Sequence, residues 1–164
     1  MNNNNLAVIV LSCDKFSCLW PLFFARLNKY FPENTYKFYL LSNNIKFEAD
    51  SHHDINVICV GDDISWSDNL IKMLDKVNEK YVMLLIDDAP FAADVDIKKL
   101  NNYFSTFIDE NMNYLNLKSS PKPNKNFELD HGYGEISKST GYRCALVPSI
   151  WKKNILYDLL KISE

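Results

Sequence analysis

Glycine is scarce in this sequence: only four glycines occur among 164 residues. None of them follows the first apolar run, Leu6–Ser12, after which the chain continues as Cys-Asp-Lys-Phe. A dinucleotide-binding Rossmann turn and a P-loop both need closely spaced glycines, because only glycine lets the backbone approach a phosphate so closely. A Gly-x-Ser-x-Gly nucleophile elbow is also missing. The sequence therefore excludes these three classes of enzyme.

Cysteine offers no metal-binding pattern. The Cys13-x4-Cys18 pair has no matching second pair, and Cys59 and Cys144 stand alone. Because no secretory signal precedes them, free thiols in a reducing compartment are expected, and a structural zinc site is disfavoured. Cys144 lies in an apolar stretch, which favours a small buried core residue over a reactive thiol.

Excess positive charge and long apolar runs are lacking as well. The formal net charge is −3, which gives no electrostatic reason to expect nucleic acid as a partner. No apolar run approaches the roughly 20 residues needed to span a bilayer. The expectation is a cytoplasmic protein, with peripheral association at the inner face of a membrane left open.

What the sequence does contain is an alternation of strand-like and helix-like segments. Strands are predicted at Leu6–Ser12, Tyr36–Ser42, Ile55–Gly61, Tyr81–Ile86, Met112–Lys118 and Tyr142–Pro148, and helices at Cys18–Phe31, Ser65–Lys80, Asp94–Glu110 and Ser149–Ser163. This order predicts one α/β domain over residues 6–164 with a largely parallel sheet. Residues 1–5 are predicted to be a disordered Asn-rich tail, and residues 119–141 a long functional or mobile loop.

Two adjacent carboxylates, Asp87 and Asp88, follow the predicted strand Tyr81–Ile86 directly. Ligands of open α/β sheets bind outside the carboxyl ends of the strands. Asp14 and Asp63 follow other predicted strands, so several acids gather at one edge and repel one another unless a cation neutralises them. For Asp63 a solvated turn is favoured. For Asp87 and Asp88 a Mg²⁺ or Mn²⁺ site is favoured over a plain turn.

Four segments in this order resemble bacterial GT-A-type glycosyltransferases of surface-polysaccharide (lipopolysaccharide or capsule) biosynthesis. They are Val8–Phe24, Trp66–Leu74, Tyr81–Phe91 and Leu146–Leu160. The resemblance implies a GT-A-like (Rossmann-like), mostly parallel sheet flanked by helices. It also implies an enzyme that moves a sugar from a nucleotide-sugar donor to a polysaccharide or lipid-linked acceptor, with a divalent cation as cofactor.

The resemblance further implies roles for particular residues. Asp87 and Asp88 would hold the metal and the diphosphate, Asp14 and Lys15 would face the nucleotide, and Asp68 would flank that pocket at a helix entry. Trp66 is interpreted either as a base- or sugar-stacking residue or as a core-edge residue. Trp20 and Trp151, among apolar neighbours, are expected to pack.

The chain departs from the family pattern in two places. Its acidic motif is Asp-Asp-Ala and not Asp-x-Asp, which leaves metal dependence open, and it ends at Glu164, where the resembling proteins continue. The alternative interpretation is therefore a truncated, non-catalytic domain that binds a nucleotide or a partner. No catalytic base is assigned; Glu128, Asp130, His131 and Glu135 are the loop candidates. Arg143 is either a phosphate contact or a solvated loop residue.

Overall fold

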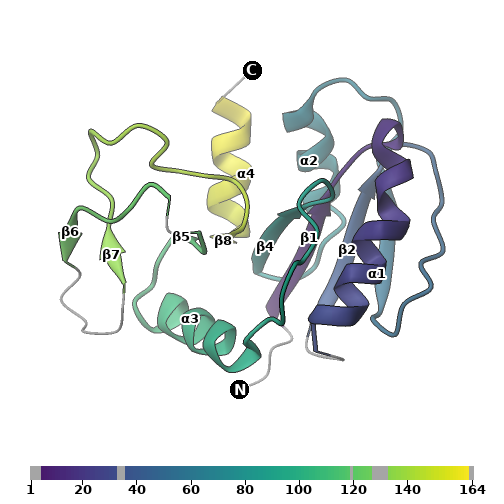
Figure 1. Cartoon of the computed structure of the whole chain (residues 1–164). Helices are drawn as coiled ribbons and strands as arrows, with labels where there is room; N and C mark the ends of the chain where they lie inside the picture. The colour runs from purple at the N-terminus through teal and green to yellow at the C-terminus, as the bar shows by residue number, and fades with distance from the viewer. Residues whose placement is uncertain (1–4, 33–35, 119, 127–132, 163–164) are drawn as a thin grey trace.

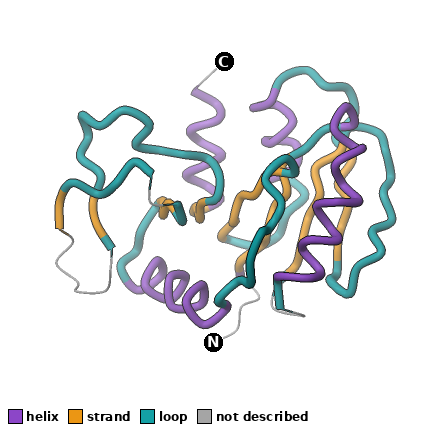
Figure 2. The backbone as a smooth tube through the Cα atoms, viewed as in Figure 1, coloured by secondary structure: helices purple, strands orange, loops and turns teal. Residues whose placement is uncertain are grey.

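The computed structural model describes residues 5–32, 36–118, 120–126 and 133–162. Its elements are β1 (Leu6–Leu11), the 3-10 helix η2 (Asp14–Leu19), α1 (Trp20–Tyr30), β2 (Lys37–Ser42), β3 (Ile55–Cys59), α2 (Trp66–Leu74), β4 (Tyr81–Ile86), α3 (Ile97–Asp109), β5 (Tyr114–Asn116), β6 (Lys125–Asn126), β7 (Gly134–Glu135), β8 (Ser149–Lys152) and α4 (Lys153–Ile162). Figure 1 labels these elements, and Figure 2 separates the strands and helices from the loops.

A six-stranded sheet in the order β3-β2-β1-β4-β8-β5 forms the centre of the molecule. Strands β3, β2, β1 and β4 run parallel to one another. Strand β8 runs antiparallel to both of its neighbours, β4 and β5. The predicted α/β architecture, a mostly parallel sheet flanked by helices, is confirmed.

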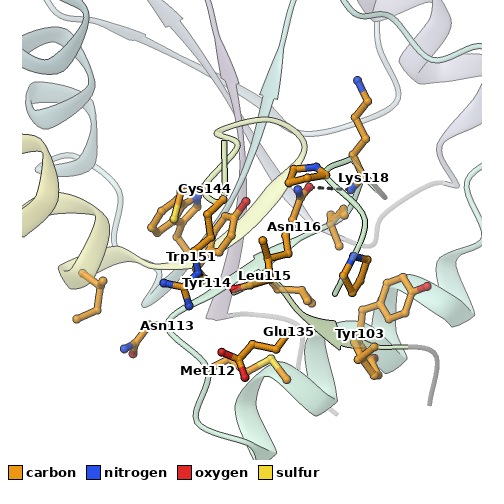
Figure 3. A pocket seen from close by; sticks show the side chains of 18 of the residues that line it. Tyr103, Met112, Asn113, Tyr114, Leu115, Asn116, Lys118, Glu135, Cys144 and Trp151 are labelled. Carbon is orange, nitrogen blue, oxygen red and sulfur yellow. Dashed lines mark hydrogen bonds between the residues drawn. The ribbon is translucent and has the colours of Figure 1, made fainter. Parts of the chain in front are cut away.

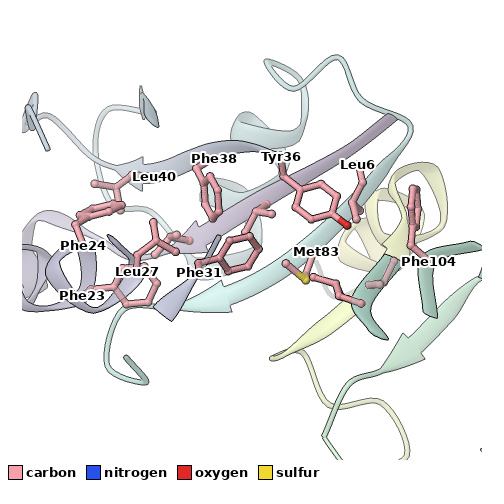
Figure 4. Packing of buried hydrophobic residues seen from close by; sticks show 14 of the residues in the cluster. Leu6, Phe23, Phe24, Leu27, Phe31, Tyr36, Phe38, Leu40, Met83 and Phe104 are labelled. Carbon is pink, nitrogen blue, oxygen red and sulfur yellow. The ribbon is translucent and has the colours of Figure 1, made fainter. Parts of the chain in front are cut away.

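Helices cover both faces of this sheet because successive residues of a strand point to opposite sides. On β1, Leu6, Val8 and Val10 pack into the cluster that contains the buried residues of α1 and α3 (Figure 4). The alternate residues Ala7, Ile9 and Leu11 pack into the cluster formed with α2 and α4. A strand buried on both faces needs a continuous apolar run, which is what the sequence of β1 provides.

Local signals set the helix starts. Pro21 lies in the first turn of α1, where its missing N–H has no partner to lose. Ser65 caps α2 by accepting a bond from the Asp68 amide at 3.1 Å. The helix then ends at Leu74, well before the predicted end at Lys80. No helix among the described residues is long and apolar enough to cross a membrane.

The prediction for residues 142–163 is wrong in its boundaries. Residues 142–148 are irregular, Ser149–Lys152 form strand β8, and α4 begins only at Lys153. Ile150 and Trp151, predicted to open a helix, are 0% and 3% exposed because they pair with β4 and β5. Short apolar runs fit a strand and a buried helical turn equally well, so only the pairing partners decide between them. Cys144 consequently lies exposed in a loop and is not a buried strand residue.

The predicted long loop at 119–141 carries a small ribbon, in which β6 and β7 pair antiparallel. The base candidates Glu128, Asp130 and His131 lie outside the described residues.

Candidate active site at the strand ends

The two central strands, β1 and β4, end side by side, with Leu11 paired to Ile86. The connection from β1 to β2 runs through α1 on one face, and the connection from β3 to β4 runs through α2 on the other. The strand order therefore reverses between β1 and β4, and ligands of open α/β sheets bind at such a switch point. Ser12 and Asp87, the next residues along each strand, occupy this position.

Asp87 is held in place by a chain of two side-chain hydrogen bonds. The indole Nε1 of Trp20 donates to the Ser12 hydroxyl oxygen at 2.7 Å, and the Ser12 hydroxyl donates to Oδ2 of Asp87 in a short bond. An indole N–H can only donate, so the single hydroxyl hydrogen of Ser12 stays available for an acceptor. The carboxylate of Asp87 is closer to this hydroxyl than the Cys13 carbonyl, which lies at 3.4 Å. This chain fixes the orientation of a carboxylate that is only 4% exposed.

Electrostatics at this acid are unfavourable for its charged form. Burial raises the pKa of Asp87, and the neighbouring charge of Asp88 raises it further, while the bond from Ser12 opposes the rise. Asp88 itself is exposed. Neither ion pair among the described residues involves either acid. The arrangement thus keeps a buried negative charge without a protein cation beside it.

Asp14 is the opposite case. Its Oδ1 accepts bonds from the Ser42 hydroxyl at 2.8 Å and from the amides of Asn43 and Ile45 at 2.9 and 3.2 Å, and its Oδ2 accepts one from the Asn44 amide at 2.9 Å. Partial burial alone raises the pKa of Asp14, but these bonds outweigh it and hold the pKa below its usual value. The carboxylate ties the loop after β1 to the loop after β2, so its predicted contact with a nucleotide competes with a structural function.

The remaining predicted site residues lie in η2, which follows β1, and in the first turn of α2, which follows β3. Lys15 is exposed. Trp66 is 45% exposed at the start of α2, and the preceding Ile64 is 69% exposed. Asp68 accepts a bond from the Ser65 hydroxyl at 2.6 Å and so belongs to the helix cap. Because Trp66 lies outside both core clusters, its exposure favours the stacking interpretation over core-edge packing.

Ser12 and the polar role of Trp20 are absent from the sequence prediction. Trp20 does pack, at 1% exposure, but its indole also makes the bond that directs Ser12. The sequence signal that could identify Ser12 is its position directly after a wholly apolar strand. Its partner, Asp87, lies 75 residues away and becomes its neighbour only through the β1–β4 pairing.

A divalent cation fits the donor chemistry of this site. Among the described residues, no group of three or more histidine, cysteine or acidic side chains forms a complete metal cage. Mg²⁺, however, is commonly bound by one or two carboxylates and completed by substrate phosphates and waters. Asp87 and Asp88 supply hard oxygen donors of that kind. They suit a cation that arrives with a diphosphate.

Comparisons with known proteins give information about the fold alone. No family model and no curated protein matches the sequence. Among solved structures, the chain is similar to the glycosyltransferase TarS of S. aureus (residues 1–349), with a TM-score of 0.57 and 11% identity over 94% of this chain and 49% of that one. A second TarS structure gives a TM-score of 0.55 and 11% identity over 94% of this chain and 29% of that one. The chain thus spans about half the length of the shorter TarS chain. The likeness shows a glycosyltransferase-like fold.

Proposed function

We propose that this chain carries the donor-binding site of a glycosyltransferase that moves a sugar from a nucleotide-sugar to a polysaccharide or lipid-linked acceptor of surface-polysaccharide assembly. One observation carries the proposal: Asp87 is buried, oriented and unneutralised at the switch point of a glycosyltransferase-like sheet. A protein retains such a carboxylate against its desolvation cost when a ligand supplies the missing positive charge.

In this proposal Asp87 and Asp88 bind a Mn²⁺ or Mg²⁺ ion together with the donor diphosphate. When bound, the cation offsets the negative charge that develops on the departing nucleoside diphosphate. Ser12 holds Asp87 in register, Lys15 and Asp14 border the nucleotide, and Trp66 offers an exposed ring to the base.

Transfer breaks the bond between the anomeric carbon and the diphosphate oxygen and forms a bond from that carbon to an acceptor oxygen. The acceptor hydroxyl must lose its proton to a base. Of the sequence candidates, only Glu135 lies among the described residues, where it pairs with Lys125 at 3.9 Å. The base therefore remains unassigned.

The proposal is tested by thermal unfolding in the presence of UDP, GDP, CDP or CMP, each with and without Mn²⁺. A ligand at 100 times its Kd stabilises the native state by about 2.7 kcal/mol. For a chain of this size that corresponds to an increase in Tm of roughly 5–10 °C. We expect one nucleoside diphosphate to raise the Tm by this amount and only when Mn²⁺ is present.

A matched pair of variants locates the effect. Asp88→Asn is expected to abolish the Mn²⁺-dependent shift, and Asp158→Asn, which removes the same charge from an exposed position on α4, is expected to retain it. An unaltered shift in Asp88→Asn, or no shift with any nucleotide in the wild type, would contradict the proposal.

A further inference from the structure

A hollow lies away from the strand-end acids, beside the edge strand β5 (Figure 3). It has a volume of about 640 Å³, which is within the usual range of small-molecule sites. We call it the β5 groove. Its walls come from α3 (Tyr103), β5 (Tyr114), the β6–β7 ribbon (Tyr133), the loop before β8 (Arg143) and β8 itself (Trp151).

The β5 groove is built from segments that leave and enter the sheet at the same edge as Asp87. Strand β8 starts at Ser149, which pairs with Leu84 near the end of β4 and with Asn116 at the end of β5. The loop that carries Arg143 therefore enters the sheet at the strand-end edge. Only β8 separates β4 from β5, and two strand spacings amount to about 10 Å.

The exposed edge of β5 gives the groove main-chain donors and acceptors. The Lys152 amide donates to the Asn113 carbonyl, and the Leu117 amide donates to the Pro148 carbonyl, so these residues of the β5 segment face β8. The backbone groups of Tyr114 and Asn116 consequently point to the opposite side. Strand β5 is the last of the sheet, and no described backbone group pairs with that side.

Arg143 is the charged group that is best placed to select a ligand. Its Nε donates to the Ile136 carbonyl at 2.8 Å, which anchors the guanidinium, and its two terminal nitrogens bond to no described residue. A guanidinium with free terminal nitrogens matches the two oxygens of a carboxylate or phosphate. The negative Glu135, which also lines the groove, has Lys125 at 3.9 Å.

The aromatic side chains of the groove form two pairs, one held by hydrogen bonds and packing and one whose hydroxyls can contact a ligand. The Tyr114 hydroxyl exchanges two 2.9 Å bonds with the backbone of Ala145, and its ring lies 4.4 Å from that of Trp151. By contrast, Tyr103 and Tyr133 are only partly buried and meet edge to face at 5.3 Å. No bond to a described residue involves either hydroxyl. Such rings present an apolar face to the C–H groups of a sugar and a polar tip to its hydroxyls.

We propose that the β5 groove binds a sugar unit that bears a carboxylate or phosphate group, with Arg143 holding the acid and Tyr103 and Tyr133 contacting the ring. The identification of this sugar as the acceptor rests on the proposed transferase function. The binding itself does not, because it needs neither Asp87 nor a nucleotide.

Calorimetric titration tests the groove directly, without nucleotide. The probes are hyaluronan tetrasaccharide (carboxylate), glucose 6-phosphate (phosphate) and chitotetraose (neutral). We expect one acidic probe to bind at least about tenfold more tightly than the neutral one, and Arg143→Gln to remove about a factor of ten, as the loss of a charge-assisted hydrogen bond predicts. Whichever acidic probe binds more tightly identifies the acid. The affinity of Arg143→Lys for the acidic probe is expected to lie between those of the wild type and Arg143→Gln, because lysine keeps the positive charge but cannot form the paired hydrogen bonds of a guanidinium.

The control is Arg26→Gln, which removes the sequence's only other arginine from an exposed position on α1. It is expected to leave binding unchanged, as is the addition of UDP with Mn²⁺. Equal losses in Arg26→Gln and Arg143→Gln, equal binding of neutral and acidic probes, competition by UDP, or no binding at millimolar probe would each overturn the inference. Acid-sugar binding by a protein that shows no nucleotide response would support the groove while contradicting the transferase.

Discussion

Asp14 and Asp87 stand at the ends of neighbouring strands, yet the protein treats them in opposite ways. Asp14 receives four hydrogen bonds, three of them from backbone amides, and its pKa is lowered. Asp87 accepts a short bond from Ser12, with smaller contributions from Trp20 and the Asp88 backbone, and its pKa is nevertheless raised, chiefly by burial. The first acid stabilises the loops that frame the site. The second is kept at a cost in stability, which is the behaviour expected of a group that serves a ligand.

The sharpest test of this contrast is Asp14→Asn. The substitution replaces a carboxylate by an amide whose NH₂ group faces backbone donors, so we expect a loss of about 2–3 kcal/mol in the free energy of unfolding at pH 7. The pKa of Asp14 in the folded protein lies below its ordinary value, so the stability that Asp14 contributes is present above the ordinary pKa and is lost as the pH falls through the folded pKa. Urea unfolding of the wild type and the variant at pH 7 and pH 3 measures the loss in unfolding free energy and its pH dependence. An equal loss at both pH values would contradict the electrostatic explanation.

A smaller loss is expected for Ser12→Ala. It removes the donor to Asp87 and the acceptor for Trp20 Nε1, and we expect a cost of about 1–2 kcal/mol. A double-mutant cycle with Asp87→Asn, read by urea unfolding, should show a coupling energy of at least about 0.5 kcal/mol. Strict additivity would mean that the Ser12–Asp87 bond contributes nothing.

Asp87→Asn should change stability in the other direction. Because the folded pKa is raised, ionisation of Asp87 costs stability as the pH rises through that pKa. We therefore expect the variant to be about 0.5–1 kcal/mol more stable than the wild type at pH 7, with the gain disappearing toward pH 3. Nucleotide-dependent stabilisation should be lost at the same time. If Asp87→Asn is less stable than the wild type at pH 7, then Asp87 contributes stability as Asp14 does, and the contrast between the two acids is wrong.

The smallest effect on stability is expected at Trp66. Its exposure predicts a change below about 0.5 kcal/mol for Trp66→Phe. The nucleotide that stabilises the protein should quench the tryptophan fluorescence of the wild type, and this quenching should be lost in Trp66→Phe, which leaves Trp20 and its bond to Ser12 in place. A flat titration at saturating nucleotide would show that the exposed ring does not stack on the base.

The parts of the fold that were predictable depend on neighbours in sequence. Strand β4 has the predicted bounds because its apolar run is flanked by charged residues, and Ser65, where a helix was predicted to begin, caps α2. The Asp87–Asp88 pair was located at a strand end for the same reason. Strand β8 was missed because Ile150 and Trp151 carry no periodicity that separates a strand from a helix over four residues.

The sequence by itself determined the alternation of strands and helices, the strand-end position of the acids and the absence of glycine-rich phosphate loops, since each depends on residues a few positions apart. Only the tertiary structure decided that Asp14 is held by backbone donors, which lower its pKa, and that Asp87 is buried, which raises its pKa. Asp14 finds its donors 28–31 residues away and Asp87 its serine 75 residues away. Strand order creates those contacts, and the energy of a carboxylate depends on the donors and the water that the fold places around it.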